Sequence, residues 1–342
     1  MAYAEGVAPS FADELIAAPI GAVLLDVLER HQHPPVPWQR PVMPDAKRIA
    51  EAADHVLEMS WGDLLANAFD AASSVGPWQP NGADEAFDAY LKVEERRPIA
   101  EAVAQAFGSQ LQAPIDLEAQ EWWVSGSRNW RHFERTSFVD FHKTYGSGEF
   151  PRNAVRTVTA PPPDVYGDFA VEQELSKDVG RWSLPVKGDS LEQLPVFTVQ
   201  RPSDWAELVE RHPLEATPHQ SCWGLPDSQS ALPPRHQLFS LDNQHASIRT
   251  HDRHLVPDWT SVATEHSAVH LSWGGWILSE GYAHLDANNT VTMVRYWLSD
   301  RTFWLRDVFG DPVRLPTPDF AHEERPNQAQ DERELLLHRL GR

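Results

Sequence analysis

The chain has 342 residues, more than the size at which one hydrophobic core usually keeps growing, so two domains are expected. Hydrophobic residues make up 41% and charged residues 23%, which is typical of a folded protein and excludes a disordered one. The formal net charge of −21 repels phosphate backbones and anionic lipid head groups, which argues against nucleic-acid and membrane partners and favours a small-molecule substrate or a cationic partner.

Two further features narrow the class of protein. Cys222 is the only cysteine, so no intramolecular disulfide can form and a cysteine-based zinc site would lack thiolates. The apolar run AAPIGAVLLDVL is interrupted by Asp26 and preceded by acidic residues, so it resembles neither a signal peptide nor a membrane span. The cytoplasm is the expected location.

The first third of the sequence has the spacing of amphipathic helices. Ser10 is a suitable N-cap for the first of them, and Pro19 is expected to break or kink it. A proline-rich connection, 31 to 44, follows. The helical segments are predicted over 10 to 30, 45 to 74 and 83 to 112.

The pattern then changes to that of a β-rich region. Short runs of β-branched and aromatic residues between proline and glycine turns predict strands at 137 to 142, 154 to 160 and 195 to 200. A helix capped by Ser203 is predicted over 203 to 212. The stretch 217 to 257 has no periodicity, and a connection of that length is more often a binding loop than filler.

From position 258 the elements are better defined. PDWTSVATEH predicts a short helix after Pro257, and AVHLSWGGWILSEGYAHL predicts two strands about Gly274 and Gly275. Two more strands are predicted, at 290 to 298 and at 302 to 309. Together these strands predict an antiparallel meander rich in aromatic residues.

These segments predict an α+β protein, with an N-terminal helical domain followed by an antiparallel β-rich C-terminal domain. The helical domain is expected to span residues 1 to 124. The β-rich domain is expected to span 125 to 316 and to contain the histidine-rich loop 217 to 257. Residues 317 to 342 are expected to form a polar tail that ends in a short helix.

Three stretches of the C-terminal region form an ordered pattern: DWAELVERHPLEAT (204 to 217), PDWTSVATEHSAVHLSWGGWILSEG (257 to 281) and TMVRYWLSDRTFWLRDVF (292 to 309). This pattern resembles that of an uncharacterised actinobacterial protein family. The resemblance implies a shared C-terminal α+β unit, and it carries no activity, substrate or catalytic residue. The segment 227 to 256 is additional to the family's pattern, which marks it as a place where this chain differs.

Six histidines lie between positions 236 and 270. A mononuclear non-haem iron site uses two histidines and one carboxylate and leaves open positions for substrate and dioxygen. A turn at 251 to 254 would bring two of these histidines together beside an aspartate, and a histidine held in a strand would add a rigid ligand. The predicted metal ligands are His245, His251, Asp252, His254 and His270.

Fe(II) is the favoured cofactor, although Zn, Mn and Ni accept the same donors. The alternative is that these histidines are solvated loop residues, since the charged Arg253 among them normally requires water. His266 would share a helix face with His270, but the strand character of AVHLSW argues against that pair.

Glu280, and Glu265 near Asp258, are carboxylates that could act as general acids or bases if buried, and Glu280 is the predicted catalytic residue. Their alternative role is as surface or capping residues. Trp273 and Trp276 are predicted to shape a substrate pocket with an aromatic floor, with a tryptophan-rich core as the alternative.

Other chemistries have weaker support in the sequence. Cys222 follows His219 by three positions, which would suit a thiolate activated by imidazole, but no local signature of a thiol enzyme surrounds them. Neither GxxxxGK[ST] nor a strand-linked GxGxxG occurs, which disfavours the common nucleotide-binding enzymes.

The sequence therefore favours a metal-dependent enzyme, with a non-haem iron oxidoreductase that tailors a small polar or heteroaromatic metabolite as the leading hypothesis. The first alternative is an acidic, tryptophan-rich binding protein that neutralises a basic partner. An NAD-using transferase with Glu280 as its acid is a third possibility.

Overall fold

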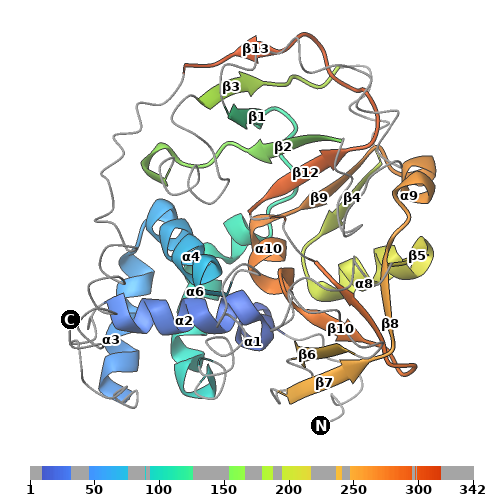
Figure 1. Cartoon of the computed structure of the whole chain (residues 1–342). Coiled ribbons are helices and arrows are strands. Elements are labelled where there is room, and N and C mark those ends of the chain that lie inside the picture. Colours follow the sequence, from blue (N-terminus) through green and yellow to red (C-terminus); the bar gives the residue numbers. More distant parts are fainter. Residues whose placement is uncertain are drawn as a thin grey trace, which may run out of the picture.

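A computed structural model describes residues 10–31, 46–75, 89, 93–125, 154–165, 179–187, 195–216, 236–240, 247–294, 297 and 299–316. The N-terminal helices gather at the lower left of Figure 1, and the strands lie above them and to their right together with α8 and α9. The helices are mainly N-terminal and a multistranded sheet is mainly C-terminal, which confirms the predicted α+β class. Within the described part, no helix is both long enough and apolar enough to span a lipid bilayer.

The helices predicted over 10 to 30 and 45 to 74 are present in the structure, each as two helices. Of the segment predicted over 83 to 112, the described part is a 3-10 turn followed by a helix that begins at Arg97. Ser10 caps the first helix in a capping box, in which its hydroxyl accepts from Asp13 N and the Asp13 carboxylate accepts from Ser10 N. Ala18 is extended because the following proline disfavours helical backbone, and this separates α1 from α2. The helices are α1 (Phe11–Ala17), α2 (Pro19–His31), α3 (Ala46–Glu58), α4 (Trp61–Val75), η1 (Val93–Arg96) and α6 (Arg97–Leu111).

A buried network of ion pairs joins α2 to the start of α6. The Arg96 guanidinium, 3% exposed, donates through Nε to Glu29 Oε2 at 2.8 Å and through Nη2 to Asp26 Oδ1. Both carboxylates lie on α2, so Arg96 ties the start of α6 to the middle of α2. Removing one partner of such a network leaves uncompensated buried charge, so the network specifies how the two helices meet.

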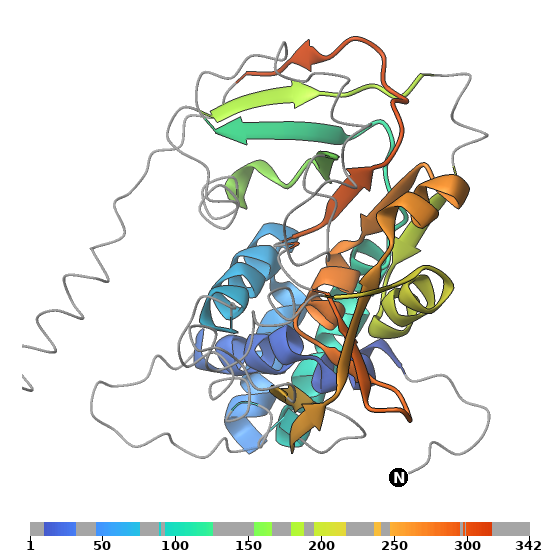
Figure 2. The same cartoon turned by 45° about the vertical axis from the view of Figure 1, so that its right-hand side comes forward.

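The larger sheet has seven strands in the order β13-β3-β1-β2-β12-β9-β4. β4 runs parallel to β9, and the other pairs are antiparallel. Its outer strands stack above the helices when the molecule is turned by 45° (Figure 2). In chain order the strands are β1 (Gln120–Ser125), β2 (Val155–Thr159), β3 (Val179–Ser183), β4 (Val196–Val199), β9 (Ala268–Leu271), β12 (Arg301–Trp304) and β13 (Val313–Arg314).

A second sheet of four strands has the order β10-β11-β8-β5, and β6 pairs with β7 as a separate hairpin. These strands are β5 (Pro213–Glu215), β6 (His236–Ser240), β7 (Ser247–His251), β8 (Arg253–Pro257), β10 (Ala283–Leu285) and β11 (Thr290–Met293). The predicted antiparallel meander is wrong, because β9 and β11 lie in different sheets and β11 runs parallel to β8. The strands predicted at 154 to 160 and 195 to 200 are present as β2 and β4, and the one at 137 to 142 lies outside the described residues.

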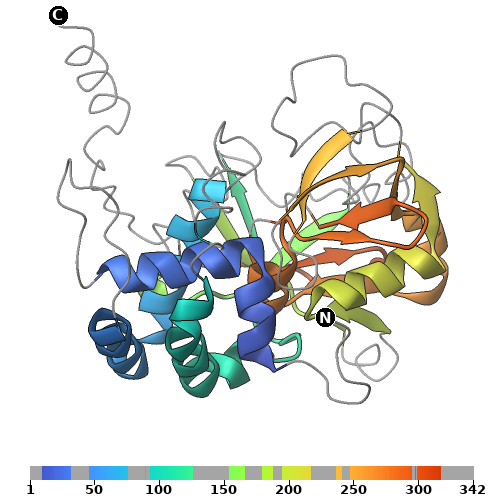
Figure 3. The ribbon, with the colours of Figure 1, turned by 90° about the horizontal axis from the view of Figure 1, so that it is seen from below.

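Two short helices, α8 (Pro202–Arg211) and α9 (Trp259–Glu265), are present where the sequence predicts helices. Asp258 caps α9 by accepting from Thr260 N and Ser261 N. The N-cap of α8 is Arg201 and not Ser203, because Pro202 already occupies the first helical turn. The view from below shows α8 running along the strands, on the side away from the N-terminal helices (Figure 3). The 3-10 turn η5 (Pro163–Val165) completes the described elements.

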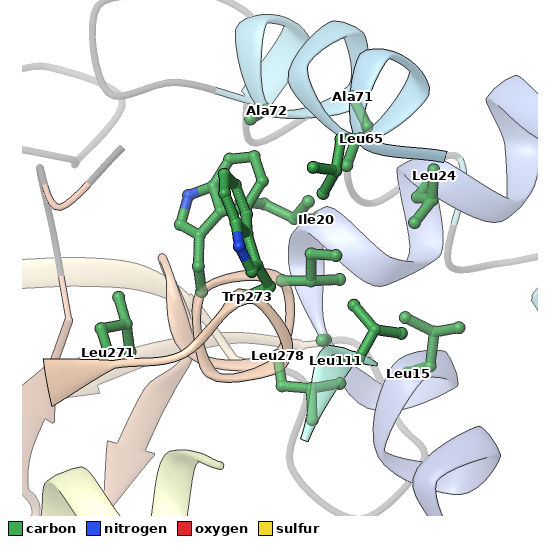
Figure 4. Packing of buried hydrophobic residues seen from close by; sticks show 14 of the residues in the cluster. Leu15, Ile20, Leu24, Leu65, Ala71, Ala72, Leu111, Leu271, Trp273 and Leu278 are labelled. Atoms are coloured by element: carbon green, nitrogen blue, oxygen red, sulfur yellow. The ribbon is translucent and has the colours of Figure 1, made fainter. Parts of the chain in front are cut away.

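The segment after β9 is a helix, α10 (Trp273–Ser279), and the strand predicted there is wrong. Ser272 caps it by accepting from Gly275 N at 3.0 Å. Gly275 lies so close to β4 that a methyl group on it would be 2.0 Å from the Val199 carbonyl oxygen. The helix carries Trp273 in among side chains of the N-terminal helices (Figure 4), so one hydrophobic core includes both parts of the chain.

Candidate metal site

The structure distributes the predicted metal ligands over separate elements. His245 lies outside the described residues, and His251 belongs to β7, although its side chain is not described. Asp252 is exposed, and its carboxylate accepts from Asn289 Nδ2 at 3.1 Å. His254 is buried in β8 of the four-stranded sheet, whereas His270 is buried in β9 of the seven-stranded sheet.

His270 is part of a buried polar pair with Asp300. Its Nδ1 lies 3.0 Å from Thr302 Oγ1, and its Nε2 lies 3.8 Å from Asp300 Oδ2. Burial lowers the pKa of His270 to about 3 and raises the pKa of Asp300 to about 7, because both sites disfavour the charged form. Thr159 N opposes the shift of Asp300 by donating to its Oδ1 at 2.9 Å. At neutral pH His270 is therefore an uncharged core residue.

The other predicted site residues lie in or against the core. Glu280 is the C-cap of α10, and its Oε2 accepts from the backbone N of Trp297 at 3.2 Å. Trp273 and Trp276 are 6% and 0% exposed, and both pack against Phe69 of α4, with ring centroids 6.1 and 5.3 Å away. Their positions are those of the alternative, a tryptophan-rich core.

A different group of side chains, of the types that can bind metals, lies close together where α8 and α9 end. His212 is the C-cap of α8, and His266 is the C-cap of α9, directly after Glu265. The next residue after His212 begins β5, which pairs with β8, and Asp258 N donates to His212 O at 2.7 Å. Pairing of β5 with β8 therefore places the end of α8 beside the start of α9. The short helix α9 then brings Glu265 and His266, at its end, close to His212.

The ligand atoms of His212, Glu265 and His266 all lie within 4.8 Å of one another. His212 Nδ1 shares a hydrogen bond of 2.8 Å with Ser261 Oγ, and this turns Nε2 toward Glu265 Oε2, 3.7 Å away. The two imidazole rings are nearly perpendicular, with centroids 6.3 Å apart. Phe197 covers His266 edge-on, with a centroid distance of 5.4 Å.

Three ring nitrogens of this group are buried without a hydrogen-bond partner in the described part of the chain: His212 Nε2, His266 Nδ1 and His266 Nε2. An unsatisfied buried polar atom costs about 1–3 kcal/mol, so native structures rarely leave one without a reason. Bound metal or another ligand is one such reason. The unpartnered ring nitrogens are therefore available to a ligand.

The protonation state of the site also suits a metal. Burial lowers the pKa of His266, and the nearby Arg211 adds to this effect while Glu265 opposes it. A neutral imidazole offers the lone pair that a metal requires. Arg211 Nη2 donates to Glu265 Oε2 at 2.6 Å, which keeps the carboxylate beside the two rings.

In the sequence, His266 is a candidate only as a partner of His270, Glu265 is a candidate acid or base, and nothing distinguishes His212. The available signal was local: both histidines directly follow a predicted helix, and one of them is preceded by a carboxylate. The decisive fact is the β5–β8 pairing, which has no local signature because β5 has only three residues. The chain matches no known protein family, no curated protein and no solved structure.

Proposed function

We propose that this protein is a metal-dependent enzyme whose metal is bound by His212, Glu265 and His266. The observation that supports it is the convergence of two imidazoles and one carboxylate, with buried ring nitrogens that lack partners. Two histidines and a carboxylate are the ligands of mononuclear non-haem Fe(II), and three protein ligands of this kind also hold catalytic zinc. The leading hypothesis from the sequence thus moves to another set of residues.

The geometry allows a metal after a small contraction. Donors about 2.1 Å from a tetrahedral ion lie about 3.4 Å apart. The present limit of 4.8 Å exceeds that by about 1.4 Å, and Glu265 can move toward the two rings because its side chain is 49% exposed. His212, in contrast, is 2% exposed and held by Ser261, so it provides a fixed point.

The chain's own residues would prepare this site for chemistry. When Ser261 Oγ accepts a hydrogen bond from the protonated Nδ1 of His212, Nε2 carries a lone pair that can bind a metal. Three protein ligands leave coordination positions open, and Fe(II) there supplies activation of dioxygen or of a substrate oxygen. We place the activity in the cytoplasm, on a small polar or heteroaromatic metabolite, in keeping with the acidic surface charge.

Metal analysis of protein purified without a histidine tag under anaerobic conditions tests this proposal. We expect one Fe(II) ion per chain, lost in the His212→Ala and Glu265→Gln variants. His284→Ala changes a partly exposed histidine of β10 and is the matched control, which should retain the metal. His254→Ala tests the ligand set expected from the sequence, and it should also retain the metal.

Thermal unfolding gives a second readout that does not depend on activity. A ligand at a hundred times its dissociation constant stabilises the native state by about 2.7 kcal/mol. Added Fe(II) should therefore raise the melting temperature of the wild type and of His284→Ala, and leave that of Glu265→Gln unchanged. Glu265 is half exposed, so this variant should fold even if His212→Ala does not. An equal shift in wild type and Glu265→Gln would refute the site.

A further inference from the structure

Two arginines, Arg211 and Arg306, lie near the candidate metal site, although the chain is strongly acidic overall. Arg211 lies beside Glu265, and its second contact is Glu207 Oε1 at 3.6 Å. Arg306 donates to the Ala263 and Thr264 carbonyl oxygens, at 2.8 and 3.1 Å, in the last turn of α9. Within the described residues Arg306 has no carboxylate partner, so its charge is not neutralised there.

A bound metal would increase the positive charge at this site. A divalent cation held by two imidazole rings and one carboxylate would keep a net positive charge, and the guanidinium groups of Arg211 and Arg306 lie near it. Such a concentration of positive charge attracts an anion. It is unexpected in a chain whose formal charge is −21, and it is located where coordination positions remain open.

The solvent-facing side of the site is the side of Arg211. The Arg211 and Glu265 side chains are 44% and 49% exposed, whereas His212 on the opposite side is 2% exposed. Arg211 is therefore accessible to a ligand from solution. The planar guanidinium matches a carboxylate, and Arg211 already pairs with one at 2.6 Å.

We propose that the metal site takes a small organic carboxylate as its ligand, with one oxygen on the metal and the other on Arg211. This inference depends on the proposed function. Glu265 Oε2 contacts both Arg211 and His212 Nε2, at 2.6 and 3.7 Å, so its transfer to the metal would leave the guanidinium with only its longer contact to Glu207 at 3.6 Å. The incoming carboxylate takes the place of Glu265 on Arg211.

A simpler role for Arg211 is competition with the metal for Glu265. The two roles make different predictions about coupling between metal and anion. If Arg211 binds the ligand, the carboxylate and the metal increase each other's affinity, and the effect requires the guanidinium. If Arg211 only competes, its removal tightens metal binding and a carboxylate in solution has no effect.

Co(II) titration followed by visible absorption distinguishes these roles. We expect acetate to tighten Co(II) binding to the wild type about tenfold, with acetamide as the uncharged control without effect. The Arg211→Gln variant should lose the acetate effect. Arg253→Gln should keep it, because Arg253 forms a similar exposed pair with Glu215 at 2.8 Å on β8, away from the site.

The outcomes separate the two proposals. Absence of saturable Co(II) binding to the wild type overturns the proposed function itself. Co(II) binding that acetate does not tighten, or an acetate effect that persists in Arg211→Gln, overturns the carboxylate ligand while the metal site stands. Equal tightening by sulfate overturns the assignment to carboxylates, because it identifies a general oxyanion site. Acetate tightening that only Arg211→Gln removes supports the inference.

Discussion

The buried pair of His270 and Asp300 makes a quantitative prediction about stability and pH. In the folded protein the pKa of Asp300 is about 7, against 3.8 for an ordinary aspartate, so burial disfavours its ionisation. The unfolded chain loses this proton near pH 4, whereas the folded chain keeps it until about pH 7. Asp300 therefore lowers the free energy of unfolding progressively as the pH rises from 4 to 7, by about 4 kcal/mol in all.

His270 has the opposite effect over nearly the same range. Its pKa falls from 6.5 to about 3, so the unfolded chain gains a proton below pH 6.5 that the folded chain does not bind. His270 therefore lowers the free energy of unfolding as the pH falls from 6.5 to 3, by about 5 kcal/mol. Between pH 4 and 6.5 each state of the wild type holds one proton on this pair, so the two dependences cancel.

Single substitutions should reveal the pH dependence that each of the two residues gives to the free energy of unfolding. Asp300→Asn keeps an oxygen acceptor for Thr159 N and removes the titrating carboxyl. Its free energy of unfolding should rise relative to wild type by about 4 kcal/mol between pH 4 and 7. His270→Asn keeps a polar group near Thr302 and should show the opposite slope, gaining relative to wild type as the pH falls.

Urea unfolding at several pH values, followed by tryptophan fluorescence, measures both slopes. The comparison is the difference in free energy between each variant and wild type, so titrations elsewhere in the chain cancel. The dependence of free energy on urea should have the same slope in all three proteins, which verifies that the variants bury the same surface. A difference that is constant with pH in either variant would show that burial does not shift these groups and would refute the reasoning.

Two further predictions concern the core. Gly275→Ala should destabilise the fold by about 3 kcal/mol, because the added methyl group would lie 2.0 Å from the Val199 carbonyl oxygen. Gly108→Ala is the control: this helical position has open space, so the substitution should stabilise the fold slightly. Urea unfolding of the two variants measures both effects, and equal effects would contradict the packing argument. Arg96→Met should cost about 3 kcal/mol in the same assay, because it removes the buried cation between Asp26 and Glu29 and leaves them only Arg30 and Arg48 as partners. A loss below about 1 kcal/mol would show that these two arginines are sufficient.

Elements defined by neighbouring residues were predictable from the sequence. The Ser10 N-cap and the break at Pro19 depend on contacts over three or four positions, and both are present in the structure. The same holds for α9, whose cap and first turn are contiguous. The α+β class followed from such segments because hydrophobic spacing of three to four residues, or of two, reports directly on helix or strand.

The metal site shows the limit of this reasoning. From the sequence, two histidines and a carboxylate are expected in the histidine-rich loop, with His270 of the following strand as a further ligand, because these residues are close in sequence. The group that the structure brings together combines His212 with Glu265 and His266, which come from the ends of two helices. That neighbourhood depends on the pairing of β5 with β8, and no periodic pattern marks such a short strand.

The sequence alone determined the acidic charge, the single cysteine, the helical first third and the local starts and stops of several helices, since each depends on composition or on residues within one turn of each other. Tertiary structure decided that the segment after β9 is a helix, because Gly275 packs against the backbone of β4 from another part of the chain. It also decided which histidines face one another. Such contacts join residues that are remote in sequence, and their free energy depends on the packed arrangement of the whole molecule.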